Sequence, residues 1–126
     1  MGLGEKMDEL NVLINKFEDR LINKGAGVRA SVLLFSEEQV HGQVQHYLVF
    51  GKLANQWRLI WERYNGDKPL GSSPLKDAAM DIRFKAVDLF ADLVAALDAE
   101  RAAREELATE QVEKLRSFLD DWDAGL

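Results

Sequence analysis

The chain has 126 residues, a formal net charge of −6 and no cysteine. Its length predicts a single domain, residues 1–126, that buries roughly two thirds of its unfolded surface, and the missing cysteine excludes disulfides, thiolate chemistry and iron–sulfur clusters. Residues 1–72 hold 9 basic and 9 acidic side chains and residues 73–126 hold 7 and 13, so the acidic second half argues against a surface that follows nucleic-acid phosphates.

The first predicted element is an amphipathic helix that ends near Gly25. Its apolar residues recur at alternating steps of four and three, and they are Leu3, Met7, Leu10, Ile14, Phe17 and Leu21. This spacing puts all six on one face of about five helical turns. We expect that face to pack on a sheet, and the alternative is the seam of a coiled coil with a second chain.

Residues 28–35 are predicted to form the first strand. One side of that strand would carry Val28, Ala30, Val32 and Leu34, and the other Arg29, Ser31, Leu33 and Phe35. Both sides become apolar toward its end, which indicates cover on both faces. The polar stretch from Ser36 to Gln43 is expected to be a loop.

The central prediction is a β-hairpin formed by residues 46–53 and 57–64, with Ala54 and Asn55 as its two loop residues. That turn fixes the register, so that Phe50 faces Leu59 and Leu48 faces Trp61. The core side of the hairpin would carry Leu48, Phe50, Trp57, Leu59 and Trp61. The outer side would carry Tyr47, Val49, Gly51, Arg58, Ile60, Glu62 and Tyr64.

After the turn Asn65-Gly66-Asp67, residues 68–70 could add a short edge strand, a position that Pro69 suits. Ser73 and Pro74 are predicted to cap and open a helix. Its buried stripe would consist of Ala79, Ile82, Ala86, Leu89, Phe90, Leu93, Val94 and Leu97. A second stripe follows Thr109 and consists of Val112, Leu115, Leu119 and Trp122.

We therefore expect two C-terminal helices with a break between residues 106 and 109, and one continuous helix is the alternative. Together the elements predict an α+β fold with an N-terminal helix and a three-stranded antiparallel meander with a possible short fourth edge strand. Both C-terminal helices would pack on one face of the sheet, the face of Trp57 and Trp61.

The order of helix, meander and helix is similar to that of the double-stranded-RNA-binding domain, and the sequence GSSPLKDAA at residues 71–79 weakly resembles the entry to that family's basic helix. The resemblance is one of topology, and we assign the chain to no family. It implies nucleic-acid binding, which we keep as a third hypothesis. The acidic helices and the single Lys76, followed at once by Asp77, argue against it.

The two histidines, His41 and His46, are the first place to look for a metal ion or a general base. They are five positions apart, so in an extended strand they point to opposite faces, and no cysteine is present to complete a zinc site. Ser31 and Ser36 lie outside any nucleophile-elbow pattern. We therefore expect no catalytic residue, no metal ion and no cofactor, and a role other than that of an enzyme.

A partner-binding surface is the more promising reading of the outer sheet side. Tyr and Arg are enriched at binding hot spots, and the candidate residues are Tyr47, Val49, Arg58, Ile60 and Tyr64. The alternative is an ordinary half-exposed sheet surface held by cross-strand ion pairs of Arg58 or Arg63 with Glu62 or Asp67.

The sequence thus predicts a non-catalytic protein-interaction domain that forms a homodimer through this sheet face or the N-terminal helix. The rival hypothesis is a small-ligand-binding or enzymatic domain, with a pocket between the sheet and the long helix near Trp57, Trp61 and Phe90. No apolar run approaches the roughly 20 residues of a membrane span. We expect a cytoplasmic protein without membrane contact.

Overall fold

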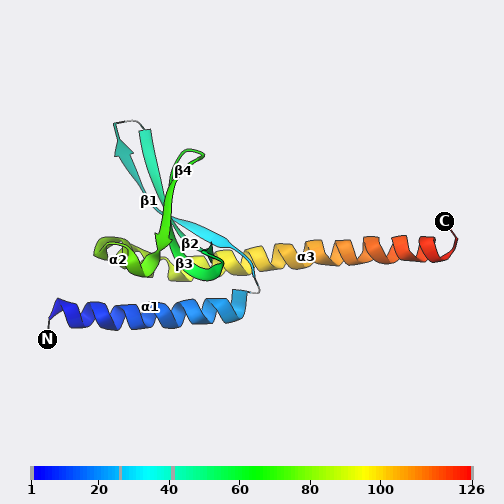
Figure 1. Ribbon diagram of the computed structural model, residues 1–126, viewed down its shortest axis with the longest axis horizontal. Coiled ribbons are helices and arrows are strands. Elements are labelled where there is room, and N and C mark those ends of the chain that lie inside the picture. The colour runs from blue at the N-terminus through cyan, green and yellow to red at the C-terminus, as the bar shows by residue number, and fades with distance from the viewer. Residues whose placement is uncertain (1, 26, 41, 126) are drawn as a thin grey trace.

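The computed structural model describes residues 2–25, 27–40 and 42–125. It confirms the α+β fold, with an N-terminal helix, a four-stranded antiparallel sheet and two C-terminal helices (Figure 1). The predicted edge strand is present as the fourth strand. In chain order the elements are α1 (Leu3–Gly25), β1 (Ala30–Gln39), β2 (Gly42–Leu53), β3 (Gln56–Asn65), β4 (Lys68–Pro74), the 3-10 helix η1 (Leu75–Asp77), α2 (Met80–Asp88) and α3 (Phe90–Asp123).

The core lies between the sheet and the helices. The strands follow one another in the order β1-β2-β3-β4, and the helices cover the face that carries Trp57 and Trp61, as predicted. From the sheet, Leu48, Phe50 and Leu59 are buried in this core. The helices contribute the buried side chains Ile14, Leu21, Ala86, Leu93 and Leu97. The apolar stripe of α1 therefore packs on the sheet, as expected for a helix of a single domain.

The register of the central hairpin is the predicted one. Phe50 is opposite Leu59, and Leu48 is opposite Trp61. Both loop residues have a positive φ, 51° at Ala54 and 68° at Asn55, which is the backbone that a two-residue turn with the twist of a hairpin requires. The turn and the side-chain alternation agree, so the two faces of the sheet are assigned correctly.

The first strand differs from its prediction. β1 continues to Gln39 and pairs with β2, so residues 36–39 and 42–43 of the stretch that was expected to be a loop belong to paired strands. A β-bulge between Leu33 and Phe35 shifts the register, and Phe35 pairs with His46. Because the bulge inserts one residue, Phe35 lies on the helix side of the sheet and not on the side of Arg29 and Ser31, with which simple alternation had grouped it.

The start of the C-terminal helices is also displaced. Ser73 and Pro74 do not open an α-helix, because both belong to β4, where they pair with Trp61 and Ile60. They are followed by the short η1, and α2 begins only at Met80. The break between the two helices is at Leu89, whose φ of −107° and ψ of 6° are not helical, and not at residues 106–109. From Phe90 to Asp123 the chain is one helix, about 50 Å long at 1.5 Å per residue.

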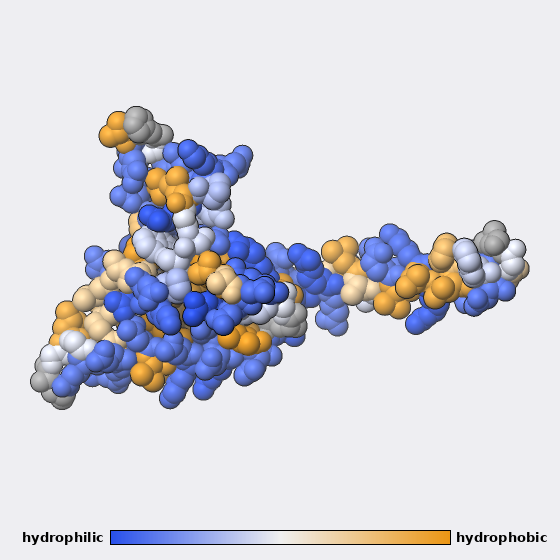
Figure 2. Space-filling model, viewed as in Figure 1, coloured by the Kyte–Doolittle hydropathy of each residue, from blue (hydrophilic) through white to orange (hydrophobic). Residues whose placement is uncertain are grey.

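The last part of α3 extends beyond the rest of the molecule (Figures 1 and 2). Its last fully buried side chain is Leu97, and every residue from 102 to 125 is exposed. We call residues 102–123 the arm and residues 2–101 the body. The second stripe of the sequence, Val112, Leu115, Leu119 and Trp122, lies on the arm, and the expectation that it packs on the sheet is wrong.

Candidate functional site

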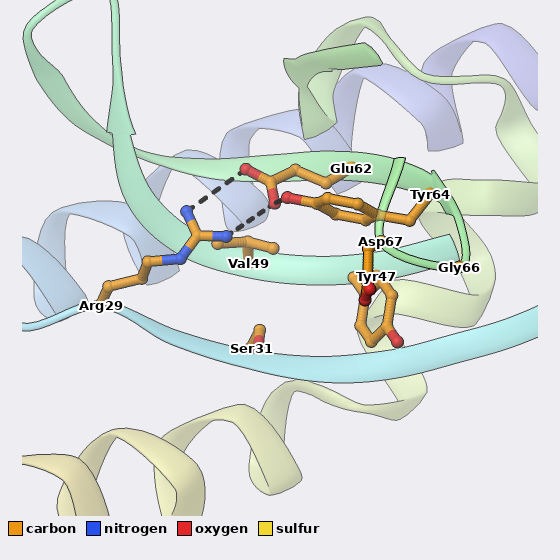
Figure 3. A pocket seen from close by; sticks show the side chains of 8 residues that line it. All are labelled: Arg29, Ser31, Tyr47, Val49, Glu62, Tyr64, Gly66 and Asp67. Atoms are coloured by element: carbon orange, nitrogen blue, oxygen red, sulfur yellow. Dashed lines mark hydrogen bonds and ion pairs between the residues drawn. The ribbon is translucent and has the colours of Figure 1, made fainter. Parts of the chain in front are cut away.

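A pocket of about 390 Å³ lies on the sheet face opposite the helices (Figure 3). Side chains reach it from all of the first three strands because alternate residues of a strand share a face. The turn between β3 and β4 closes one end. Its lining residues are Arg29, Ser31, Tyr47, Val49, Glu62, Tyr64, Gly66 and Asp67.

Two of the three charged side chains in this pocket, Arg29 and Glu62, bind each other. Arg29 donates to Glu62 through two nitrogens, Nη2 to Oε1 at 2.6 Å and Nη1 to Oε2 at 3.3 Å. The Tyr64 hydroxyl donates to the same Oε1 at 2.9 Å. The hydrogen bond to Glu62 raises the pKa of Tyr64, and the hydrogen bond between Arg29 and Glu62 raises the pKa of Arg29. Glu62 is only 7% exposed, so this network stabilises a carboxylate that burial would otherwise disfavour.

The structure brings together three of the five predicted partner-binding residues. Tyr47, Val49 and Tyr64 line the pocket, and the rings of Tyr47 and Tyr64 meet edge to face with centroids 5.8 Å apart. Val49 and Ile60 are both 0% exposed. Their expected exposure is therefore wrong, and the apolar part of this face is smaller than the sequence indicated.

Arg29 explains part of the difference between the expected and the observed exposure of this sheet face. Its side chain reaches across Gly51, where an added Cβ would lie 3.5 Å from Arg29 Cγ and 3.0 Å from Nη1. The pairing of Ile60 with Pro74 places β4 beside the other edge of β3. The sequence placed Glu62 on the outer side of the hairpin and left open which face Arg29 would join, so the pairing of the two was missed. The role of this face in binding a partner stays a prediction.

On the opposite face, His46 is 5% exposed and fully engaged in contacts. Its Nδ1 accepts a hydrogen bond from Trp61 Nε1 at 3.0 Å, which assigns the proton to Nε2, and Nε2 lies 3.1 Å from Glu37 Oε2. The His46 ring stacks on Phe35 with centroids 4.2 Å apart. This histidine therefore has a structural role in the sheet, while His41 lies outside the described residues.

A second pocket, of about 410 Å³, lies beside His46. Apolar side chains from β1, β3, β4 and α2 form much of it, and Glu37, His46 and Arg63 are its charged or titratable members. In the described part of the chain, no three His, Asp or Glu side chains gather closely enough to hold a metal ion.

The arm carries the largest exposed apolar side chains of the C-terminal half. Val112, Leu115, Leu119 and Trp122 follow one another at steps of three and four, and the exposed fraction of Trp122 is 63%. Figure 2 shows hydrophobic side chains along the whole projecting helix. We call these four residues the arm stripe. Leu107 and Phe118 are also exposed.

The arm stripe continues the face by which α3 packs on the sheet. Leu97 and Leu115 are 18 positions apart, as are Val94 and Val112, and 18 residues make about five turns. Each pair therefore lies on one side of the helix. Leu97 and Val94 pack in the core, whereas their counterparts on the arm are more than half exposed.

Comparisons of the chain with protein-family models, with curated proteins and with solved structures found no match. Within residues 2–25, 27–40 and 42–125, no helix combines the length and the apolar character that crossing a membrane requires.

Proposed function

We propose that this protein is a non-catalytic protein-interaction domain of the cytoplasm, and that the arm stripe is its main contact surface. The observation that carries the proposal is the arm itself, a projecting helix with four large apolar residues on one face, Phe118 beside them, and charged residues on the opposite face. An apolar helix face at heptad-like spacing is a recurrent means by which one protein binds a helix or groove of another.

The stability of the arm supports this role. Within the described part of the chain, the arm has no tertiary packing of its own, and in proteins most of the stability of a helix comes from the packing of an amphipathic face. The arm has a favourable composition, rich in Ala, Glu, Leu, Lys and Arg. Burial of the stripe against a partner would supply the tertiary packing that normally stabilises a helix of this kind.

Site-specific photo-cross-linking in cells that make the protein tests the proposal. A benzophenone side chain in place of Leu115 should cross-link to protein, either a second copy or another chain. Ser117 is the matched control, because it is exposed and lies about 200° around the same helix at 100° per residue. Equal cross-linking yields at both positions would contradict the proposal.

Small-ligand binding is a second candidate function, favoured by the pocket beside His46. The walls of this pocket include the aromatic side chains of Phe35 and Trp61, and its charged residues include Glu37 and Arg63. An apolar lining with a few polar groups is typical of ligand-binding sites. Soaking crystals with a fragment collection tests it. Fragments that bind this pocket in preference to the pocket of Arg29 and Glu62 would favour it.

A further inference from the structure

We infer that the partner of the arm is the arm of a second copy of this chain, bound in antiparallel orientation. This inference rests on the proposed function, since it names the partner of the same surface. The spacing of the arm stripe, with steps of three and four, is the spacing of positions a and d in a coiled coil. A second arm presents a stripe of the same spacing, so the two surfaces can be complementary.

The distribution of charge along α3 sets the orientation. From Arg101 to Asp123 the charges fall into four blocks, which are basic Arg101 and Arg104, acidic Glu105, Glu106, Glu110 and Glu113, basic Lys114 and Arg116, and acidic Asp120, Asp121 and Asp123; the acidic residues Asp98 and Glu100 precede them. A parallel pair in register places each block beside itself, which is repulsive. An antiparallel pair with Val112 opposite Leu115 places Glu110 and Glu113 of one arm beside Lys114 and Arg116 of the other, which is attractive. It also brings Asp123 level with Arg104, while Asp121 comes level with Glu106.

The tip of the arm gives a second reason for this orientation. Asp120, Asp121 and Asp123 lie in the last turn and a half of α3, and no basic residue is present in its last turn. Negative charge at the C-terminus of a helix is unfavourable because the helix dipole is negative there. In an antiparallel pair, Arg104 of the second copy lies near this end and offsets the unfavourable charge.

A register that matches the stripes also fills a hollow at the base of the arm. When Val112 faces Leu115 of the second copy, Ala108 faces Leu119, and Trp122 reaches the level of residues 104 and 105. A recess of about 490 Å³ is present there, between the start of β1 and α3. It is lined by Arg29, Ala30, Ser31, Ala96, Ala99, Glu100 and Arg104. The small side chains of α3 in this recess leave room for an indole ring.

Sedimentation velocity of the full-length purified protein tests the identity of the partner. We expect a dimer at micromolar concentration, and at least a tenfold weaker association of the double variant Leu115→Glu/Leu119→Glu. Ser117→Glu is the matched control, because it adds a charge to the outer side of the same turn and should leave the dimer intact. The substituted residues are exposed, so circular dichroism of the body should stay unchanged in all of them.

A distance measurement tests the orientation. The chain has no cysteine, so Ala103→Cys provides a unique site for a spin label. In the antiparallel pair the two labels lie about 10 residues on either side of the midpoint, which separates them by about 30 Å at 1.5 Å per residue. In a parallel pair the two labels are level along the axis, so their separation is only the width of the pair: about 10 Å between the helix axes plus the outward reach of both side chains. This separation is shorter than that in the antiparallel pair.

The outcomes separate this inference from the proposed function. A dimer with the long distance supports antiparallel pairing, and a dimer with a short distance overturns the orientation alone. A monomer at all concentrations overturns pairing of two copies; if Leu115 then cross-links to a different protein in cells, the arm is still the contact surface. A dimer that the double variant leaves intact would overturn the use of the arm.

Discussion

Ala54 holds a backbone conformation that its side chain disfavours. Its φ is 51°, in the left-handed region, where the Cβ of an ordinary residue costs about 1 kcal/mol. Asn tolerates this region because its side chain can bond to the local backbone. The hairpin that orders the sheet is therefore formed in spite of its first loop residue.

We expect Ala54→Asn to raise the free energy of unfolding by roughly 0.5–1 kcal/mol, because it relieves that strain. Urea denaturation of the purified protein measures the change. Asn55→Ala is the matched control, since the φ of Asn55 is 68°, and it should change stability in the opposite direction. A loss of stability in Ala54→Asn would contradict this account of the turn.

Tyr64 should ionise at a higher pH than an ordinary tyrosine, because its hydroxyl donates to Glu62 and this bond raises its pKa. The chain has two tyrosines, so absorbance titration of Tyr47→Phe follows Tyr64 alone. We expect its midpoint to lie above about 10, the value for an unfolded chain. A midpoint at or below that value would show that the hydrogen bond does not persist in solution.

The same shift affects stability at alkaline pH. The pKa of Tyr64 is higher in the folded state than in the unfolded state, so its stabilising contribution is complete below about pH 10 and is lost as pH rises through the folded pKa. Tyr64→Phe removes this contribution. The free energy of unfolding should therefore fall less steeply above pH 10 in Tyr64→Phe than in the wild type.

At the scale of elements, the central strands bury both of their faces. Ile60 and Val49 are fully buried on the outer face, while Leu59 and Phe50 are buried on the helix face. We expect Ile60→Glu to destabilise the body by more than about 3 kcal/mol, since it places an unpaired charge in a buried position. Thermal unfolding followed by circular dichroism measures the effect.

Arg58→Gln is the control for that substitution. Arg58 lies two positions before Ile60 on the same face of β3 and is only half-buried, so its replacement should change stability by less than about 1 kcal/mol. A folded Ile60→Glu protein with an unchanged melting temperature would show that this face is open to solvent.

The elements that were predicted correctly are those with a local signal. The alternation of apolar residues and a two-residue turn are enough to fix the register of β2 and β3. The stripe of α1 is likewise a local pattern. The bulge near Phe35 and the break at Leu89 have no glycine or proline to mark them, because tertiary packing on both sides of these residues determines them.

For the candidate sites too, features with a local sequence signal were predicted, and features that depend on the tertiary fold were not. Tyr47 and Tyr64 were placed on one face by alternation together with the register that the two-residue turn fixes. The ion pair between Arg29 and Glu62 joins residues 33 positions apart, which no local pattern predicts. The arm stripe was found in the sequence, but its exposure depends on where the sheet ends, and that is a property of the three-dimensional fold.

At the scale of the whole molecule, the body contains all of the buried core. We expect a chain that ends at Arg101 to keep a cooperative unfolding transition, with a free energy of unfolding within about 1 kcal/mol of that of the variant Leu115→Glu/Leu119→Glu, because residues 102–125 are exposed. Urea denaturation compares the two proteins. An unfolded or non-cooperative truncated chain would show that the arm stabilises the body.

The break at Leu89 is the last one in the helical part of the chain. Beyond it, one uninterrupted helix supplies Leu93 and Leu97 to the core and carries Trp122 at its far end. With no glycine or proline between Phe90 and Asp123, this helix has no hinge. A partner bound at the tip would therefore be held at a fixed distance and orientation relative to the sheet. A force applied to the tip would be transmitted along the helix to Leu93 and Leu97 in the core.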